Sequence, residues 1–309
     1  MFSRFYSERI RDNANFSFFG LVHRAGSLFD ENDFTGDENA IVDFKYSPSP
    51  KITWWFDHHQ SAFLTPEDHE HFLHNQSNKK FYDPDFRSCT KFLATIAENQ
   101  FGFHPEPVAE LIEWADIVDG AQYKDAKTAV EMREPAMKLT MVIESTQDKT
   151  FTARLIPLLA YHSLKEIVEN PLVAPLIPPL MERHERSVDI MRERSECKQG
   201  TIFCNVMDHD LEGYNKFVPY YLHPGSTYSV GLSKSSFRTK VSVGSNPWTR
   251  MRPENMENLA LICERYGGGG HARVGAISFD PNQEDRALEA AHEIVAELRA
   301  SVAKVAASY

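Results

Sequence analysis

The segment Ile52–Gln60 constrains the fold of this chain more than any other. Its apolar part is followed at once by Asp57, His58 and His59. This pattern is typical of a buried strand that delivers polar side chains at its carboxyl end, where open α/β sheets place their sites. A second apolar run ends in Asp43. Two neighbouring strands of this kind predict a cluster of oxygen and nitrogen ligands for one or two divalent cations. The alternative is a turn with a solvated aspartate and two ordinary histidines.

Length and charge restrict the kind of protein and its partners. The chain has 309 residues and a net charge of −11, and its length predicts two domains of about 150 residues each. The negative charge argues against a non-specific nucleic-acid coat, against binding to anionic membranes and against long duplex nucleic acid as a partner. It leaves a small phosphate substrate possible, because a local cationic or metal site can hold one.

Cysteine spacing and the N-terminus bear on the compartment. The four cysteines are scattered and form no close pair, so neither a disulfide framework nor a zinc ribbon is predicted. We expect reduced thiols in a cytoplasmic protein. Residues 1–20 contain charges throughout and no signal-peptide core, and no apolar stretch is long enough to span a membrane.

Two segments of the N-terminal half carry further candidate site residues. Ser88 precedes a helix predicted over 91–100 and is a plausible N-cap, although a helix N-terminus is also a good anion site. A second helix, over 105–118, ends near Asp116 and Asp119, which can share one helical face. Because the helix dipole disfavours acids at that end, we expect one of them to complete a metal shell. The alternative for both is a solvated surface carboxylate.

The run Gly267–Gly270 before His271 is the second informative motif. A single glycine suffices to end a helix, so four in a row exceed what capping requires. They let a ligand approach the backbone, and consecutive N–H groups can form a concave site for an anion. The alternative is a flexible loop between a helix and a strand. Elsewhere we expect strands at 16–23, 201–206, 217–222, 227–232, 240–243 and 274–279, and helices at 181–197, 255–266 and 284–307.

These two motifs, in this order and about 210 residues apart, resemble those of the DHH–DHHA1 phosphoesterase superfamily. It includes RecJ-type exonucleases, nanoRNA/pAp phosphatases and cyclic-dinucleotide hydrolases. The resemblance implies an α/β protein with a mostly parallel-sheet DHH domain over residues 1–145, a helical linker over 146–197, and a smaller α/β DHHA1 domain over 198–309. It also implies an active cleft between the two domains and two Mn²⁺ ions, with Mg²⁺ as a possible substitute.

The resemblance assigns roles to individual residues. Asp43 matches an aspartate that usually bridges two metals, and His58 matches a metal-binding histidine. Asp57 and His59 match catalytic residues that orient ligands or contact phosphate. Either Asp116 or Asp119 matches a further metal ligand, and the sequence leaves both open. Substrate-binding positions fall on Ser88, Thr90, Gly268, Gly269, Gly270 and His271.

The family's first motif, His-x-x-x-Asp-x-Asp, is not found. The stretch from His23 to Asp30 has the wrong spacing, so a protein with one metal or none stays open. We expect a metal-dependent phosphoesterase for a small phosphate ester or short oligonucleotide, with a homodimer left open. The alternatives are a catalytically impaired relative that binds a nucleotide or phosphate ligand, and an exopolyphosphatase-like hydrolase.

Overall fold

The chain forms two compact units in a computed structural model, which describes residues 1–21, 28–146, 148–211 and 213–307. The first unit comprises Met1–Tyr123 and Arg133–Ile177, and the second comprises Lys124–Met132 and Pro178–Tyr309. The segment predicted as a linker is therefore shared between the units, while the predicted boundaries at residues 145 and 197 stay predictions. None of the helices described has both the length and the hydropathy needed to cross a membrane.

The first unit contains a sheet of three parallel strands in the order β1 (Asn39–Val42), β2 (Ile52–Asp57) and β3 (Lys80–Tyr82). The predicted α/β fold with a parallel N-terminal sheet is confirmed. Because the strands run in the same direction, the residues that follow them lie at one edge of the sheet. Asp43 follows β1 and His58 follows β2 at that edge.

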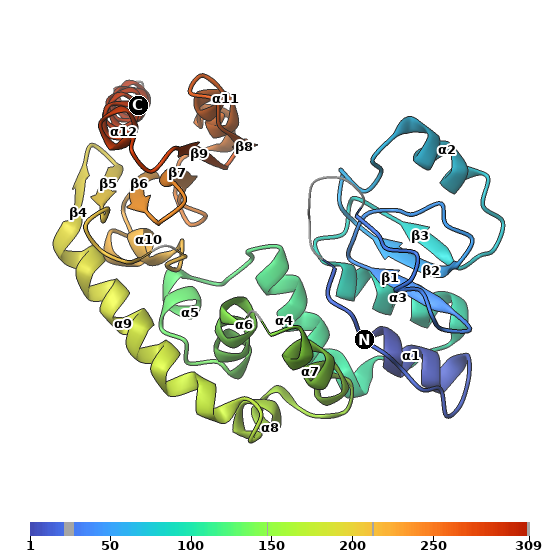
Figure 1. Cartoon of the computed structure of the whole chain (residues 1–309). Coiled ribbons are helices and arrows are strands. Elements are labelled where there is room, and N and C mark those ends of the chain that lie inside the picture. Colours follow the sequence, from blue (N-terminus) through green and yellow to red (C-terminus); the bar gives the residue numbers. More distant parts are fainter. Residues whose placement is uncertain (22–27, 147, 212, 308–309) are drawn as a thin grey trace. The chain divides into compact units, whose positions relative to one another are not determined.

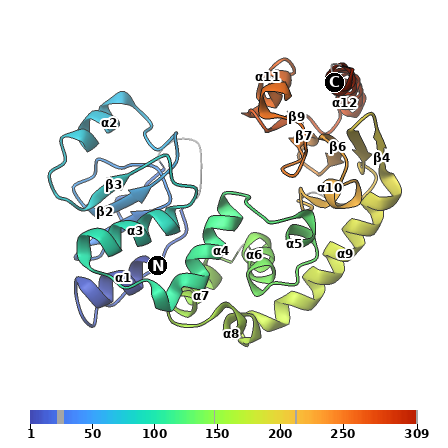
Figure 2. The same cartoon turned by 180° about the vertical axis from the view of Figure 1, so that it is seen from behind.

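Helices cover both faces of this sheet, because β2 is apolar on both sides. Trp54 and Phe56 pack into one core with Phe5 and Phe92, whereas Trp55 packs into a second core on the opposite face. Figures 1 and 2 show α1 and α3 on one side of the sheet and α2 on the other. The helices of this unit are α1 (Phe2–Arg9), α2 (Pro66–Leu73), α3 (Cys89–Phe101), η1 (Glu106–Val108), α4 (Ala109–Asp119), α6 (Pro135–Ser145), α7 (Lys149–Tyr161), α8 (Leu164–Glu169) and η2 (Ala174–Leu176).

The strand predicted at 16–23 is wrong for the described residues 16–21, which form no regular element. The aromatic side chains here pack locally: the rings of Phe16 and Phe18 are stacked with centroids 5.9 Å apart, and Phe16 also meets Tyr6 edge-on at 5.8 Å. The rest of the prediction, including His23, lies outside the described residues.

The second unit contains a mixed sheet in the order β4 (Ser195–Lys198), β5 (Thr201–Asn205), β6 (Tyr228–Lys234), β7 (Thr239–Ser245), β9 (Val274–Phe279) and β8 (Gly269–His271). The pair β5–β6 is parallel and the other pairs are antiparallel. Val230, Leu232 and Val241 of the sheet pack against the two helices α11 (Leu259–Glu264) and α12 (Glu284–Ala306). The remaining helices are α5 (Ala126–Val130), α9 (Ile177–Arg194), α10 (Val218–Leu222) and η3 (Pro253–Asn255).

Most predicted elements of this unit are present, with shifted ends, but 217–222 is helical rather than extended. Pro219 occupies the first turn of α10, a position that suits proline because no N–H is needed there. Three consecutive residues of this apolar run, Val218, Pro219 and Tyr220, are buried. Figure 1 shows α10 on the opposite side of the sheet from α11 and α12.

The hydroxyl of Tyr220 reaches the sheet beside Gly244, a residue of β7 that has no side chain. The same hydroxyl forms a 2.8 Å hydrogen bond with Ser229 Oγ, and a Cβ added to Gly244 would lie 2.6 Å from the hydroxyl oxygen. We expect Gly244→Ala to destabilise the protein by about 1–3 kcal/mol, because a buried side chain has to move. In a Tyr220→Phe background the same change should cost much less, which a double-mutant cycle of urea unfolding measures. If the free-energy costs of the two substitutions were strictly additive, the expected steric clash between the Cβ added at position 244 and the Tyr220 hydroxyl would be contradicted.

Candidate metal centre

Asp43 is held beside the end of β2 by its own backbone. It has φ +61, a left-handed conformation that aspartate tolerates better than most residues. Its N–H donates a 2.9 Å hydrogen bond to the carbonyl of Phe56. The next residue, Phe44, accepts a 2.9 Å hydrogen bond from Nε1–H of Trp55. Two bonds to the central strand therefore fix the position from which the Asp43 carboxylate projects.

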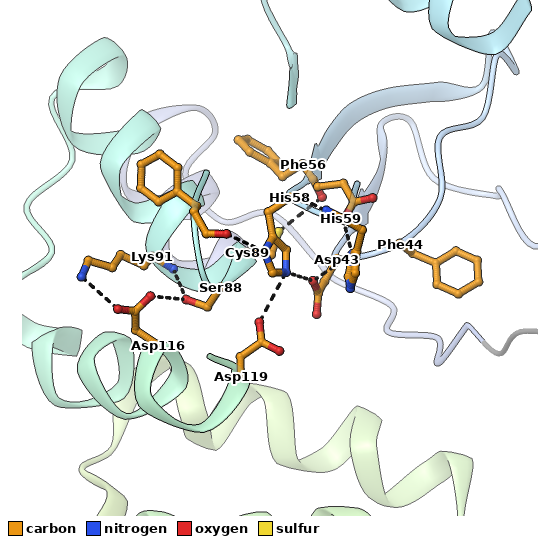
Figure 3. A network of polar contacts seen from close by, with 12 residues as sticks. Asp43, Phe44, Phe56, His58, His59, Ser88, Cys89, Lys91, Asp116 and Asp119 are labelled. Carbon is orange, nitrogen blue, oxygen red and sulfur yellow. Dashed lines mark hydrogen bonds and ion pairs between the residues drawn. The ribbon is translucent and has the colours of Figure 1, made fainter. Parts of the chain in front are cut away.

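His58 points its outer nitrogen at two carboxylates. Its Nε2 lies 3.3 Å from Oδ1 of Asp43 and 3.4 Å from Oδ2 of Asp119, and its side chain is only 10% exposed. Figure 3 shows the ring directed between these two acids. On the other side of the ring, Nδ1 lies 2.9 Å from the carbonyl oxygen of Phe86. A carbonyl only accepts, so Nδ1 must carry the hydrogen.

This tautomer decides what the site can hold. With the hydrogen on Nδ1, Nε2 of the neutral ring presents a lone pair to the oxygens of Asp43 and Asp119. Nε2 is buried and has no hydrogen-bond partner among the described residues. Electron-rich atoms at such distances repel one another unless a proton or a cation lies between them. Oxygen and imidazole ligands, with the second ring nitrogen anchored to a carbonyl, fit a divalent cation.

Asp57 organises the loop that carries both histidines. It is fully buried, and its Oδ1 accepts hydrogen bonds from the backbone N–H groups of His58 (2.9 Å) and His59 (3.3 Å) and from Nδ1 of His59 (2.6 Å). The His59 side chain is about half exposed at 48%, and its Nδ1 lies 3.9 Å from Oδ1 of Asp43. Asp43, His58 and His59 together form a group that could hold a metal ion. The buried Asp57 is therefore not part of this group, but it orients His59 through the hydrogen bond to Nδ1.

Asp116 and Asp119, which the sequence left as alternatives, have different partners. Asp116 accepts hydrogen bonds from Ser88 Oγ at 3.2 Å and from Lys91 Nζ at 3.0 Å. Asp119 instead faces His58 (Figure 3). Burial and the neighbouring Asp43 carboxylate raise the pKa of Asp119 above its usual value of 3.8. The geometry therefore favours Asp119 as the ligand, and the metal-binding role of either residue stays a prediction.

The raised pKa of Asp119 predicts a stability effect in metal-free protein. A carboxyl whose folded pKa exceeds its unfolded value destabilises the folded state when charged, and the penalty disappears as the pH falls below the unfolded value. We therefore expect Asp119→Asn to raise the melting temperature in EDTA at pH 7. The gain should vanish below about pH 3.8. Thermal unfolding followed by circular dichroism checks this, and a lower melting temperature at pH 7 would contradict it.

Ser88 and Thr90 lie at the start of α3. Ser88 is the N-cap: its Oγ accepts a 3.2 Å hydrogen bond from the N–H of Lys91. Since Ser88 also donates to Asp116, both of its bonding roles are satisfied within the protein. Thr90 lies in the first turn of α3. Their predicted contact with substrate stays a prediction.

The glycine run before His271 belongs to the second unit and is only partly a loop. Gly269–His271 forms β8, which pairs with β9. A Cβ on Gly268 would lie 2.3 Å from the carbonyl oxygen of Ala276, and one on Gly270 would lie 2.2 Å from that of Val274. Close strand pairing therefore accounts for two of these glycines, whereas Gly269 would meet nothing within 4 Å. His271 is exposed, and phosphate binding by this segment stays a prediction.

Two features of the centre have no signal in the sequence. The Phe86 carbonyl that fixes the tautomer of His58 is a backbone group, so no residue type marks it. The Trp55–Phe44 hydrogen bond joins a residue predicted only as core to the segment that positions Asp43. The stretch with the wrong spacing for the first motif begins at His23, which lies outside the described residues.

Comparison with known proteins places the fold. No protein-family model matches the sequence, and no curated protein matches it significantly. Among solved structures, a pGpG-specific phosphodiesterase, PggH from Vibrio cholerae, is similar with 17% identity and a TM-score of 0.67, over 96% of this chain and 95% of that one. The two chains thus share one overall fold, and the predicted α/β fold is confirmed at this level.

Two further structures are more distant. An exopolyphosphatase-related protein from Bacteroides fragilis has 14% identity and a TM-score of 0.40, over 86% of this chain and 74% of that one. A DHH domain from a protein described as a member of a family of ribosomal proteins has 14% identity and a TM-score of 0.49, over 84% of this chain and 69% of that one. Both scores lie below 0.5, so the fold assignment rests on the first structure.

Proposed function

We propose that this chain is a metal-dependent phosphoesterase that hydrolyses a small phosphate ester or a short oligonucleotide. The observation that carries the proposal is the buried Nε2 of His58 at the carboxyl edge of a parallel sheet. This nitrogen lies 3.3 Å from Asp43 and 3.4 Å from Asp119 and has no hydrogen-bond partner among the described residues. The fold supports it, because the similar solved structure is named as a pGpG-specific phosphodiesterase. We infer that a linear dinucleotide such as pGpG is a substrate worth testing first.

The residues of the centre have different proposed roles in metal binding, proton transfer and positioning. Asp43, His58 and Asp119 would hold the cation, and Mn²⁺ is the ion we propose. A divalent cation supplies Lewis-acid chemistry: it acidifies water and offsets the negative charge of phosphoryl oxygens. His59 is tied to Asp57 through Nδ1, which leaves its Nε2 to accept or donate a proton at the half-exposed surface of the site. Asp57 acts as a positioning residue because its buried carboxylate holds His59 and two backbone N–H groups.

The proposed substrates and the cysteines favour a reducing compartment. Cys89, Cys197, Cys204 and Cys263 are all free thiols, a pattern that suits the cytoplasm. Nucleotide substrates are found there as well.

The test is turnover with metal analysis on the full chain. We expect Mn²⁺-dependent hydrolysis of pGpG, pAp or a short RNA, inhibited by EDTA, with Mn²⁺ retained after gel filtration. His58→Ala should abolish both turnover and metal retention, which also excludes a contaminating hydrolase. Metal retention gives a readout independent of the substrate chosen. Wild-type protein that neither retains Mn²⁺ nor turns over any of the three substrates would overturn the proposal.

A second candidate function, nucleotide binding without turnover, follows from one specific observation. The sequence contains no His-x-x-x-Asp-x-Asp pattern ahead of Asp43, and that motif supplies ligands in the proteins that this chain resembles. Under this alternative the chain would bind pGpG or pAp in the presence of Mn²⁺ and release it unchanged. Chromatography of the bound nucleotide after prolonged incubation separates the two functions, since hydrolysis products appear only under the first.

A further inference from the structure

The second unit contains a cavity of about 830 Å³ that the proposed hydrolysis does not use. It is lined by residues 224–227 before β6, by the segment after β7 and by the C-terminal turns of α12, Val302 and Val305 among them. Its volume lies in the range of sites for drug-sized ligands. None of its lining residues belongs to the metal centre or to the run Gly267–His271.

Ser226 indicates that the cavity is a site for a polar ligand. Ser226 is 1% exposed and is one of the residues that line the cavity. Its Oγ is buried and has no hydrogen-bond partner among the described residues. A buried hydroxyl without a partner is uncommon, because the loss of its water is not compensated. A ligand with a hydrogen-bonding group in the cavity would supply that partner.

Asn246 fixes the two segments that carry the polar wall. Its Nδ2 donates to the carbonyls of Ser226 at 2.8 Å and Pro224 at 3.3 Å, and its Oδ1 accepts from the N–H of Trp248 at 3.0 Å. Its own N–H donates to the carbonyl of Thr227 at 2.8 Å. Because Asn246 is 2% exposed, these hydrogen bonds lie inside the protein. The wall is therefore organised before any ligand arrives, which lowers the entropic cost of binding.

The remaining lining residues define the chemistry of the ligand. Arg250 and Arg252 are exposed and line the cavity, which has no carboxylate among its lining residues. The carboxylate of Glu254 lies 3.9 Å from Arg252, at the limit of an ion pair. Guanidinium groups match phosphate geometrically and electrostatically. Trp248 offers a flat aromatic ring, and the valines of α12 offer apolar surface, which together suit a planar base.

We propose that this cavity binds a nucleoside monophosphate. The phosphate contacts Arg250 and Arg252, the base packs against Trp248 and the valines of α12, and the Ser226 hydroxyl hydrogen-bonds to the ligand. The site lies wholly within the second unit and needs no metal. It therefore does not depend on the proposed function.

The experiment is calorimetric titration of the full chain in EDTA with GMP and AMP, beside guanosine and inorganic phosphate. At least one nucleotide should bind at least about tenfold more tightly than either fragment, since both halves of the ligand contribute. Ser226→Ala should weaken binding about 3–10-fold, the usual effect of one hydrogen bond. Arg250→Gln with Arg252→Gln should weaken it by at least about tenfold and reduce its salt dependence.

Matched controls separate this site from charge effects and from the metal centre. Arg186→Gln with Arg192→Gln makes the same change in charge on α9, where both arginines pair with acids of the same helix, and should leave the affinity unchanged. His58→Ala should also leave it unchanged. The proposal is overturned if neither nucleotide binds at about 10 mM, if inorganic phosphate binds as tightly, if the Ser226 and arginine variants bind normally, or if His58→Ala abolishes binding.

Discussion

Asp119→Asn is expected to weaken Mn²⁺ binding by more than about 100-fold, because it removes a charged ligand rather than an outer partner of one. Asp116→Asn should leave metal affinity within about threefold of wild type. Asp116 lies only three residues away on the same helix, but its carboxylate pairs with Ser88 and Lys91. The two variants make the same chemical change in the same helix. Their difference therefore reports which carboxylate faces His58.

Calorimetric Mn²⁺ titration of both variants measures this difference, and turnover of pGpG should fall in parallel for Asp119→Asn alone. The melting temperature of metal-free Asp119→Asn, which is expected to exceed that of wild type, shows whether loss of fold contributes to the result. The assignment is wrong if Asp116→Asn loses the metal and Asp119→Asn keeps it. Equal losses of Mn²⁺ affinity in both variants would mean that the two carboxylates at the end of α4 contribute equally. That result would also contradict the assignment of Asp119 as the ligand.

Trp55→Ala is expected to destabilise the protein by about 3–5 kcal/mol, the usual range for truncating a large buried aromatic residue. Trp55 has no exposed surface, and its ring meets Tyr46 edge-on with centroids 4.8 Å apart. The change also leaves the Phe44 carbonyl without the Nε1–H donor. Such a loss is a large fraction of the stability of a typical domain. Urea unfolding followed by fluorescence measures it.

Trp55→Phe is the matched control, because it keeps an aromatic ring and removes the hydrogen bond. We expect a smaller destabilisation and, in folded protein, weaker Mn²⁺ binding, since Phe44 adjoins the ligand Asp43. A Trp55→Ala variant within about 1 kcal/mol of wild type would show that the ring does not hold the sheet together. A Trp55→Phe variant with wild-type Mn²⁺ affinity would show that the hydrogen bond does not position Asp43.

The edge of the first sheet was predictable because strand patterns are local. An apolar run that ends in polar residues marks both the strand and its carboxyl end, so Asp43 and His58 could be placed together from the sequence. The choice between Asp116 and Asp119 could not be made in this way. It depends on how α4 docks beside α3, where Ser88 and Lys91 engage the first acid and leave the second facing His58.

The second unit shows a different limit. The run 217–222 has a pattern that suits either a strand or a helix, and periodicity over so few residues does not separate them. The helix that forms here places Tyr220 within hydrogen-bonding distance of Ser229 on the sheet, a contact that the local pattern does not indicate. The glycine run before His271 predicts either a ligand-binding segment or a flexible loop. Two of its glycines allow β8 to approach β9 closely, a contact that depends on a strand later in the chain.

The left-handed backbone conformation of Asp43 restricts which residues can replace it. At φ +61, glycine, asparagine and aspartate are the residues that fit without strain. Asp43→Glu would lengthen the side chain by one methylene, and it would also place a residue that disfavours the left-handed conformation at this position. In a mutational library, position 43 should therefore tolerate far fewer residues than position 58, even when selection asks only for a folded chain. Lineages that abandon metal chemistry should lose the histidine first and keep a small polar residue or glycine at the turn.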